Sequence, residues 1–285
     1  MSALLDDIGL CPATLLADPM AAGPDDLRAA AEAAAAAGDG ALSLWAFQAQ
    51  AYGLDQARVL FDDLGLHTGA VEAALGWAGG ASAAMRVEAE SLVDAAQRLG
   101  ASLVMAVTME PTIDTGTAAE GLAELAAIAA AADLRVAVEF LPWSGIPTLA
   151  AANDLIVAVD DPVAGIVVDC WHWQRQPGGP DLELLRSLPP ERIAYLQLCD
   201  AGPEPQPDVY GEAMTARRLP GDGVVDLAAL LGALDQIGAR PFVASEVFSA
   251  ELAALGPEEA ARRVHDACAA LRSLVPPGPG GPDAR

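Results

Sequence analysis

Ile166-Val167-Val168-Asp169 is a short apolar run, rich in β-branched residues, that ends in a carboxylate. Runs of this kind are typical of buried strands in a parallel sheet. A charged or amide side chain is costly in such a strand unless it is paired or coordinated. Because such a polar residue recurs at the ends of four successive predicted strands, we expect these strand ends to converge on one ion. The other three runs are Val136-Ala137-Val138-Glu139-Phe140, Tyr195-Leu196-Gln197-Leu198 and Val243-Ala244-Ser245-Glu246-Val247.

Apolar runs and alanine-rich amphipathic stretches alternate along the whole chain. We expect strands at about 8–11, 41–46, 67–73, 102–108, 135–140, 165–170, 193–199 and 241–247. We expect helices near 24–37, 53–64, 81–99, 117–132, 148–159, 181–187, 226–237 and 257–274. Helix-entry signals stand at Pro24, Thr148 and Pro257.

Eight strands that are each followed by a helix are typical of a (β/α)₈ TIM barrel, which usually has about 250 residues. The rival, a doubly wound sheet, often has a glycine-rich first turn, unlike Cys11-Pro12-Ala13-Thr14 here. We therefore predict an α/β protein with one barrel domain over residues 1–275. Residues 276–285 are rich in proline and glycine, which predicts a disordered tail.

Composition excludes several classes of function. The net charge of −25 would repel phosphate backbones, so nucleic acid is not an expected partner. No apolar run approaches the roughly 18 residues of a membrane span, and an N-terminus with Asp6 and Asp7 does not resemble a secretory signal. We therefore expect a cytoplasmic protein without a membrane partner. The chain has no lysine, which excludes Schiff-base aldolases, pyridoxal-phosphate enzymes and Walker P-loops.

The four polar strand ends predict a metal site. In a TIM barrel the active site lies at the carboxyl ends of the strands, and neighbouring strands are about 4.8 Å apart. Four adjacent ends can therefore share one ion. Oxygen ligands favour Mn²⁺ or Mg²⁺ over a soft-ligand zinc site, whereas without a cation the carboxylates would raise one another's pKa. Separate salt bridges are the alternative. The candidate metal ligands are Glu139, Asp169, Gln197 and Glu246.

Further candidates follow the same strands. His172 comes just after Asp169, and an imidazole that titrates near neutral pH can move protons. Arg217, in the long loop after the seventh strand, can bind a substrate oxygen, although a surface ion pair is an equal alternative. Trp143 and Trp173 would form walls of a substrate pocket, or would belong to the core.

As a set, these motifs resemble the xylose-isomerase-like TIM-barrel superfamily, the sugar phosphate isomerase/epimerase group. The resemblance implies one divalent metal ion held by four strand-end residues. It also implies that the two glutamates move protons, and that the histidine and the loop arginine contact substrate. The residues that carry it are Glu139, Asp169-x-x-His172, Gln197-Leu198-Cys199-Asp200-Ala201, Arg217 with Pro220-Gly221-Asp222-Gly223, and Glu246.

The chain departs from the family pattern at two points. Many related epimerases have histidine as the third ligand, where this chain has Gln197, which resembles the 3-dehydroshikimate dehydratase branch. The epimerases also tend to have another acid after the fifth-strand glutamate, where this chain has Trp143 and Gly145. The motif residues therefore indicate the superfamily more clearly than they indicate which reaction the protein catalyses.

We expect a metal-dependent isomerase or epimerase of carbohydrate metabolism. Its substrate would be a small polyol-type ketone, either a keto-sugar or a cyclitol. A glutamate or His172 would remove the proton α to the carbonyl, and the metal would stabilise the resulting enediolate. Loss of a β-hydroxyl would instead make the enzyme a lyase, that is, a dehydratase acting on 3-dehydroshikimate or inosose. A non-catalytic sugar-binding or accessory subunit is the third alternative, and a homo-oligomer is compatible with each.

Overall fold

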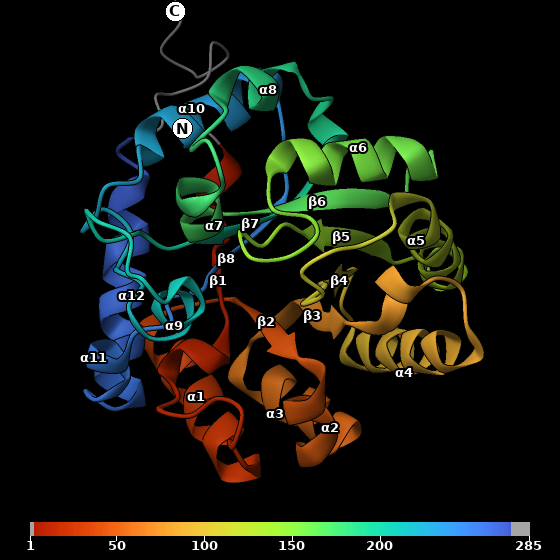
Figure 1. Cartoon of the computed structure of the whole chain (residues 1–285). Coiled ribbons are helices and arrows are strands. Elements are labelled where there is room, and N and C mark those ends of the chain that lie inside the picture. The colour runs from red at the N-terminus through yellow and green to blue at the C-terminus, as the bar shows by residue number, and fades with distance from the viewer. Residues whose placement is uncertain (1–2, 275–285) are drawn as a thin grey trace, which may run out of the picture.

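The computed structural model describes residues 3–274, and its centre is a closed barrel of eight parallel strands, β1 to β8, in chain order (Figure 1). The predicted TIM barrel is thereby confirmed. The tail predicted over residues 276–285 lies outside the described residues. The strands are β1 (Gly9–Leu10), β2 (Ala41–Trp45), β3 (His67–Ala74), β4 (Leu103–Ala106), β5 (Arg135–Glu139), β6 (Ala164–Asp169), β7 (Ile193–Leu198) and β8 (Phe242–Ser245).

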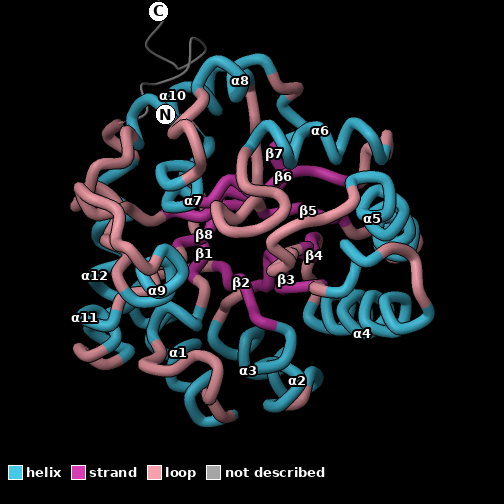
Figure 2. Tube along the Cα trace, viewed as in Figure 1, coloured by secondary structure: helices cyan, strands magenta, loops and turns pink. Residues whose placement is uncertain are grey.

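Helices surround the strands on all sides (Figure 2), and α1 packs beside α12 to complete the ring. Eight of these helices are α1 (Pro24–Ala37), α3 (Leu54–Leu64), α4 (Ala83–Leu99), α5 (Thr115–Ala130), α6 (Leu149–Val159), α8 (Leu182–Ser187), α10 (Leu227–Ile237) and α12 (Pro257–Leu271). These correspond to the eight predicted helices. None in the described part of the chain is long and apolar enough to cross a membrane.

Four short helices were not predicted, and each lies in a connection that follows a strand. They are α2 (Ala46–Tyr52), α7 (Cys170–Arg175), α9 (Val209–Thr215) and α11 (Ala250–Ala253). A helix of four to seven residues shows too few turns to display a 3.6-residue period, and so short a helix depends on tertiary packing. These connections lie at the carboxyl ends of the strands, where a TIM barrel has its active site.

The predicted helix starts are confirmed by their caps. Thr148 is the N-cap of α6, and its side-chain oxygen accepts a hydrogen bond from the backbone N–H of Ala151 at 3.1 Å. Pro24 and Pro257 occupy the first turns of α1 and α12, where the missing N–H of proline costs nothing.

The two faces of each strand have different environments. Val136 and Val138 of β5 pack outward against the helices, whereas Ala137 belongs to a separate cluster inside the barrel. Because side chains alternate along a strand, Glu139 has the same direction as Ala137 and points inward. The same two-residue spacing relates Val167 to Asp169, Tyr195 to Gln197 and Ala244 to Glu246. The polar residues are therefore directed into the interior at the carboxyl end of the barrel.

Candidate active site

The four predicted metal ligands are all buried at the carboxyl end of the barrel. Glu139 ends β5, Asp169 ends β6, Gln197 is the penultimate residue of β7, and Glu246 follows β8 directly. Their exposed fractions are 5%, 0%, 0% and 4%. Asp169 and Gln197 are register partners, and the backbone N–H of Glu246 donates to the carbonyl of Leu198 at 3.0 Å. Adjacent strands therefore place these side chains in one region.

Potential ligand atoms form two groups there. Glu139, Asp169 and His172 offer ligand atoms that all lie within 4.8 Å of one another. Glu246 belongs to a second such group, with Glu72 and Cys11. The arrangement thus includes the predicted carboxylates and adds side chains from β3 and from the residue after β1.

Arg217 lies between two of the predicted ligands. Its Nη1 donates to Oδ2 of Asp169 at 2.8 Å and to Oε2 of Glu246 at 3.1 Å. Its Nε donates to the carbonyl of Ala213 at 2.7 Å, which fixes the guanidinium plane. No hydrogen bond within residues 3–274 involves its Nη2. Arg217 is only 3% exposed, so its ion pairs with the two acids are buried. The side chain also lines a cavity, where its Nη2 remains for another partner.

Asp169 connects the strand to the following helix. Its Oδ1 accepts the backbone N–H of His172 at 2.8 Å, so the carboxylate is the N-cap of α7. This cap explains why His172 follows the strand by three residues and turns back toward the site. His172 Nε2 lies 3.5 Å from Oε1 of Glu139, and its Nδ1 has no hydrogen-bond partner among the residues that the structure describes.

The burial of His172 corrects one expectation. Desolvation lowers the pKa of this imidazole to about 3; the charge of Arg217 acts in the same direction, and that of Asp169 opposes it. His172 is therefore neutral at pH 7 rather than titrating near it. A neutral imidazole still offers one donor and one acceptor to a ligand.

The pKa values of Glu139 and Glu246 are shifted in the opposite direction, upward. Burial raises the pKa of Glu139 well above its ordinary range, and the neighbouring charges of Glu246 and Asp169 raise it further. Burial and the charge of Glu72 raise the pKa of Glu246 to about 8. Carboxylates gathered in a desolvated site hold protons at neutral pH unless a cation neutralises them.

Gln197 provides the clearest test of whether a metal ion fits. Both its Oε1 and its Nε2 are buried, and neither has a hydrogen-bond partner in the described part of the chain. An unpaired buried amide costs about 1–3 kcal/mol, so such a group calls for a ligand. A cation bound to Oε1 would satisfy the oxygen, and three adjacent carboxylates would supply the charge. The residues present therefore fit a divalent ion.

A cavity of about 470 Å³ opens onto these groups. Glu139, Glu246, His172 and Arg217 line it, together with aromatic walls. Trp143 is one of these walls, with its ring centre 5.3 Å from that of His172. Trp173 is 2% exposed, packs in the outer core and does not line the cavity. Of the two alternatives for Trp173, a pocket wall or a core residue, this position favours the core.

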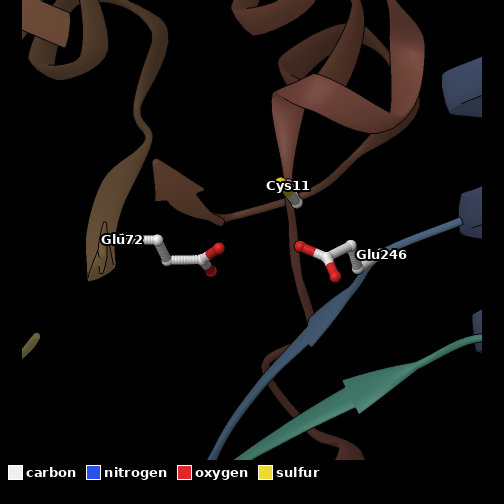
Figure 3. Close-up of side chains that lie close together, drawn as sticks. All are labelled: Cys11, Glu72 and Glu246. Atoms are coloured by element: carbon white, nitrogen blue, oxygen red, sulfur yellow. The ribbon is translucent and has the colours of Figure 1, made fainter. Parts of the chain in front are cut away.

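Glu72 is a site residue that the sequence reasoning missed. It lies on β3, is 3% exposed, and accepts hydrogen bonds at Oε1 from Ser43 Oγ and from Tyr195 Oη, the latter at 3.2 Å. Figure 3 shows its carboxylate facing that of Glu246, with Cys11 beside the gap between them. An acidic residue near the end of an apolar strand was already the signal for the other ligands, so the same signal could have found Glu72.

Asp200 organises the loop that carries Arg217. Its carboxylate accepts backbone N–H groups of Ala201, Gly221 and Val225 at 2.8, 3.0 and 2.9 Å. Its own backbone pairs with Arg218, the neighbour of Arg217. Asp200 therefore has a structural role in this loop, although it lies only two residues after β7.

We expect Asp200→Ala to lower the free energy of unfolding by about 2–4 kcal/mol, because three backbone donors would lose their acceptor in a largely buried place. Urea unfolding followed by circular dichroism would measure the loss. Asp222→Ala, an exposed acid in the same loop, is the matched control and should change stability by less than about 0.5 kcal/mol. Equal effects of the two substitutions would contradict this role of Asp200.

The sequence matches the xylose isomerase-like TIM barrel family over residues 26–274. The chain belongs to this family. The inosose isomerase of Bacillus velezensis is 28% identical over 194 residues, which are 65% of this chain and 68% of that protein. The inosose isomerase of Bacillus licheniformis is 30% identical over 183 residues, 61% of this chain and 64% of that protein.

Solved structures share the fold of this family member. A crystal structure of the IolI protein with a bound zinc atom has a TM-score of 0.79 at 21% identity, covering 94% of this chain and 98% of that one. A D-psicose 3-epimerase of Clostridium cellulolyticum H10, solved with D-tagatose, has a TM-score of 0.73 at 16% identity, covering 94% and 99%. At such identities the likeness concerns the fold alone.

Proposed function

We propose that the chain is a divalent-metal-dependent isomerase that moves a proton next to the carbonyl group of a cyclic polyhydroxylated ketone of the inosose type. The observation that carries this proposal is the pair of buried glutamates, Glu139 and Glu246, which line one cavity and whose pKa values are both raised. Relatives named inosose isomerase support the substrate class.

The metal ion would be held by the oxygen-rich set Glu139, Asp169, Gln197 and Glu246, with His172 Nε2 beside it. The unpaired amide of Gln197 supports this assignment, as does the zinc atom in the related IolI structure. The predominance of oxygen ligands favours Mn²⁺ or Mg²⁺ in this chain. When bound, such an ion would act as a Lewis acid that polarises the carbonyl oxygen of the substrate.

The two glutamates would move the proton. Glu139 comes from β5 and Glu246 from the end of β8, so two strands separate them around the barrel. A ketone that lies between them would present a different face to each carboxylate. One glutamate would take the proton at its carboxylate oxygen, and the other would return one to the opposite face or to the neighbouring carbon.

The remaining residues would position the substrate. Arg217 Nη2 can donate to a substrate oxygen, because Nη1 and Nε are already engaged. His172 would accept or donate a hydrogen bond as a neutral imidazole. Trp143 would cover an apolar face of the ring and exclude water from the reacting carbon.

Proton NMR in D₂O tests the reaction. The Mn²⁺-loaded protein is incubated with an inosose, with ketohexoses and with 3-dehydroshikimate, and a chelator-treated sample is the control. We expect deuterium to enter next to the carbonyl of the inosose, with a new isomer formed. Water loss from 3-dehydroshikimate would instead identify a lyase. Absence of both exchange and conversion with every substrate would contradict an enzymatic role.

Metal binding can be tested without turnover. In a chelator, the free energy of unfolding should fall as the pH rises from about 5 to about 8. The pKa of Glu246 is about 8 in the folded protein against an ordinary value of 4.5. Across this range the folded state keeps a proton that the unfolded state has released, so a rise in pH favours unfolding.

Mn²⁺ should reverse this trend, because it binds the ionised carboxylates. At about 100 times its dissociation constant it would add roughly 2.7 kcal/mol, and the rise in Tm should be larger at pH 8 than at pH 6. Thermal unfolding at both pH values measures the effect, and Glu246→Gln should flatten the pH dependence. A Tm that does not respond to Mn²⁺ at either pH would contradict the metal site.

A further inference from the structure

We propose that Glu72 accepts a hydrogen bond from a substrate hydroxyl and makes the cavity selective for uncharged cyclic polyols. This inference rests on the proposed function and adds a specificity-determining residue to it. Glu72 lines the same cavity as Glu139 and Glu246, but it stands on β3, away from the strands that carry the four candidate metal ligands.

The carboxylate of Glu72 is held rigidly on one side. Ser43 on β2 and Tyr195 on β7 both donate their hydroxyl protons to its Oε1. Strands β3 and β7 lie on opposite sides of the eight-stranded ring, so the tyrosine reaches across the barrel interior to make this contact. Two donors from separate strands orient the carboxylate and leave its other oxygen free.

The second carboxylate oxygen of Glu72, Oε2, lacks a hydrogen-bond donor from the described residues. Oε2 of Glu72 is buried and has no hydrogen-bond partner among residues 3–274, and the side chain points toward the carboxylate of Glu246 (Figure 3). Two facing carboxylates repel each other unless a donor or a cation lies between them. Cys11, the third member of this group, is fully buried and does not line the cavity. This favours a donor that enters through the cavity, such as a hydroxyl, over a second ion held by the thiol.

The charges around the cavity oppose an anionic substrate. Arg217 is the only arginine among the described residues that line it, and two acids already share its Nη1. As formal charges, one divalent ion and one guanidinium do not balance the four surrounding carboxylates, so a substrate carboxylate or phosphate would meet excess negative charge. These carboxylates are Glu72, Glu139, Asp169 and Glu246.

The walls near Glu72 suit the apolar face of a ring. Trp45 and Phe248 both line the cavity, and their ring centres are 5.7 Å apart in an edge-on arrangement. Met105 adds another apolar surface. A cyclic polyol has C–H faces and a rim of hydroxyl groups, which matches apolar walls with a fixed acceptor at their edge.

Calorimetric binding of two non-reacting probes to the Mn²⁺-loaded protein tests the inference. The probes are myo-inositol, which is uncharged, and quinate, a cyclic polyol with a carboxylate. We expect myo-inositol to bind at least tenfold more tightly than quinate. Glu72→Ala should weaken myo-inositol binding by about ten- to a hundredfold, as expected for loss of a hydrogen bond to a charged group, and should affect quinate less. Tyr195→Phe, which removes one of the positioning donors, should have a smaller effect in the same direction.

Glu88→Gln is the matched control. Glu88 borders the same cavity, but both of its oxygens already accept backbone N–H groups, from Leu75 at 2.6 Å and Gly76 at 3.0 Å. This variant should therefore leave the affinity for myo-inositol within about twofold. Circular dichroism establishes that each variant is folded.

Several results would overturn the inference. These are quinate binding as tightly as myo-inositol, no binding of myo-inositol by the unmodified protein, or an unchanged affinity in Glu72→Ala. Two Mn²⁺ ions per chain, reduced to one by Glu72→Ala, would identify Glu72 as a metal ligand instead. Because binding is measured without turnover, these outcomes are separate from the NMR test of isomerisation.

Discussion

Arg217→Ala should lower the free energy of unfolding by about 3–5 kcal/mol when no divalent ion is present, and should also lower kcat/KM. The guanidinium is buried between Asp169 and Glu246, so its removal leaves the buried Asp169 carboxylate without its hydrogen-bonded cation and the buried Glu246 carboxyl group without its donor. Urea unfolding in a chelator measures the first effect, and steady-state kinetics on inosose measures the second.

The Arg217→Ala variant also tests whether a metal ion binds at this site. If an ion is bound by Asp169 and Glu246, it partly replaces the lost positive charge, and the stability loss should shrink when Mn²⁺ is added. Arg217→Lys should rescue only in part, because an ammonium cannot reproduce the forked geometry that reaches both acids and the carbonyl of Ala213.

Arg218→Ala is the matched control for these measurements. Arg218 is the next residue in the same loop and is exposed, and its pairing with Asp200 uses backbone atoms that alanine retains. Its substitution should change stability by less than about 0.5 kcal/mol and leave turnover nearly unchanged. If Arg218→Ala proved as damaging as Arg217→Ala, the buried ion pair would not be the cause.

Glu246→Gln should lower turnover by roughly 10²- to 10⁴-fold, the usual contribution of a positioned acid–base group. The amide preserves the size of the side chain but cannot take up a proton. Glu139→Gln should have an effect of similar size, because the proposed reaction needs a proton moved by each carboxylate. Deuterium incorporation into inosose, followed by NMR, measures both.

Metal content separates the two roles that each glutamate could have. If Mn²⁺ per chain stays near the unmodified level while exchange is lost, the glutamate moves protons; if metal and exchange are lost together, it acts chiefly as a ligand. Glu251→Gln, an exposed acid on α11, controls for the loss of one negative charge. Turnover within threefold of the unmodified protein would show that Glu246 takes no part.

Many residues of this site could be predicted from local sequence patterns. A polar residue at the inward position near the end of an otherwise apolar strand is visible in sequence, because side chains alternate with a period of two. That rule identified Glu139, Asp169, Gln197 and Glu246, and it applies equally to Glu72. The helix starts at Thr148 and Pro257 were visible for the same reason, since each depends on a few consecutive residues.

Contacts between distant segments could not be read in this way. Trp143 and Trp173 have similar positions after neighbouring strands, yet only Trp143 lines the cavity, because packing against the surrounding helices decides which ring is covered. The neutral state of His172 also depends on burial by residues far away in the chain.

The amino-acid sequence by itself therefore determined the barrel and the inward direction of its acidic strand ends, since both follow from local periodicity and a repeated β/α unit. The tertiary structure alone decided which of these groups are paired. Arg217 bridges acids from two different strands, and Tyr195 reaches across the barrel to Glu72. These contacts depend on the closure of the ring, which brings together Glu72 and Tyr195 across 123 positions and Gly9 and Ser245 across 236, and no local pattern records such proximity.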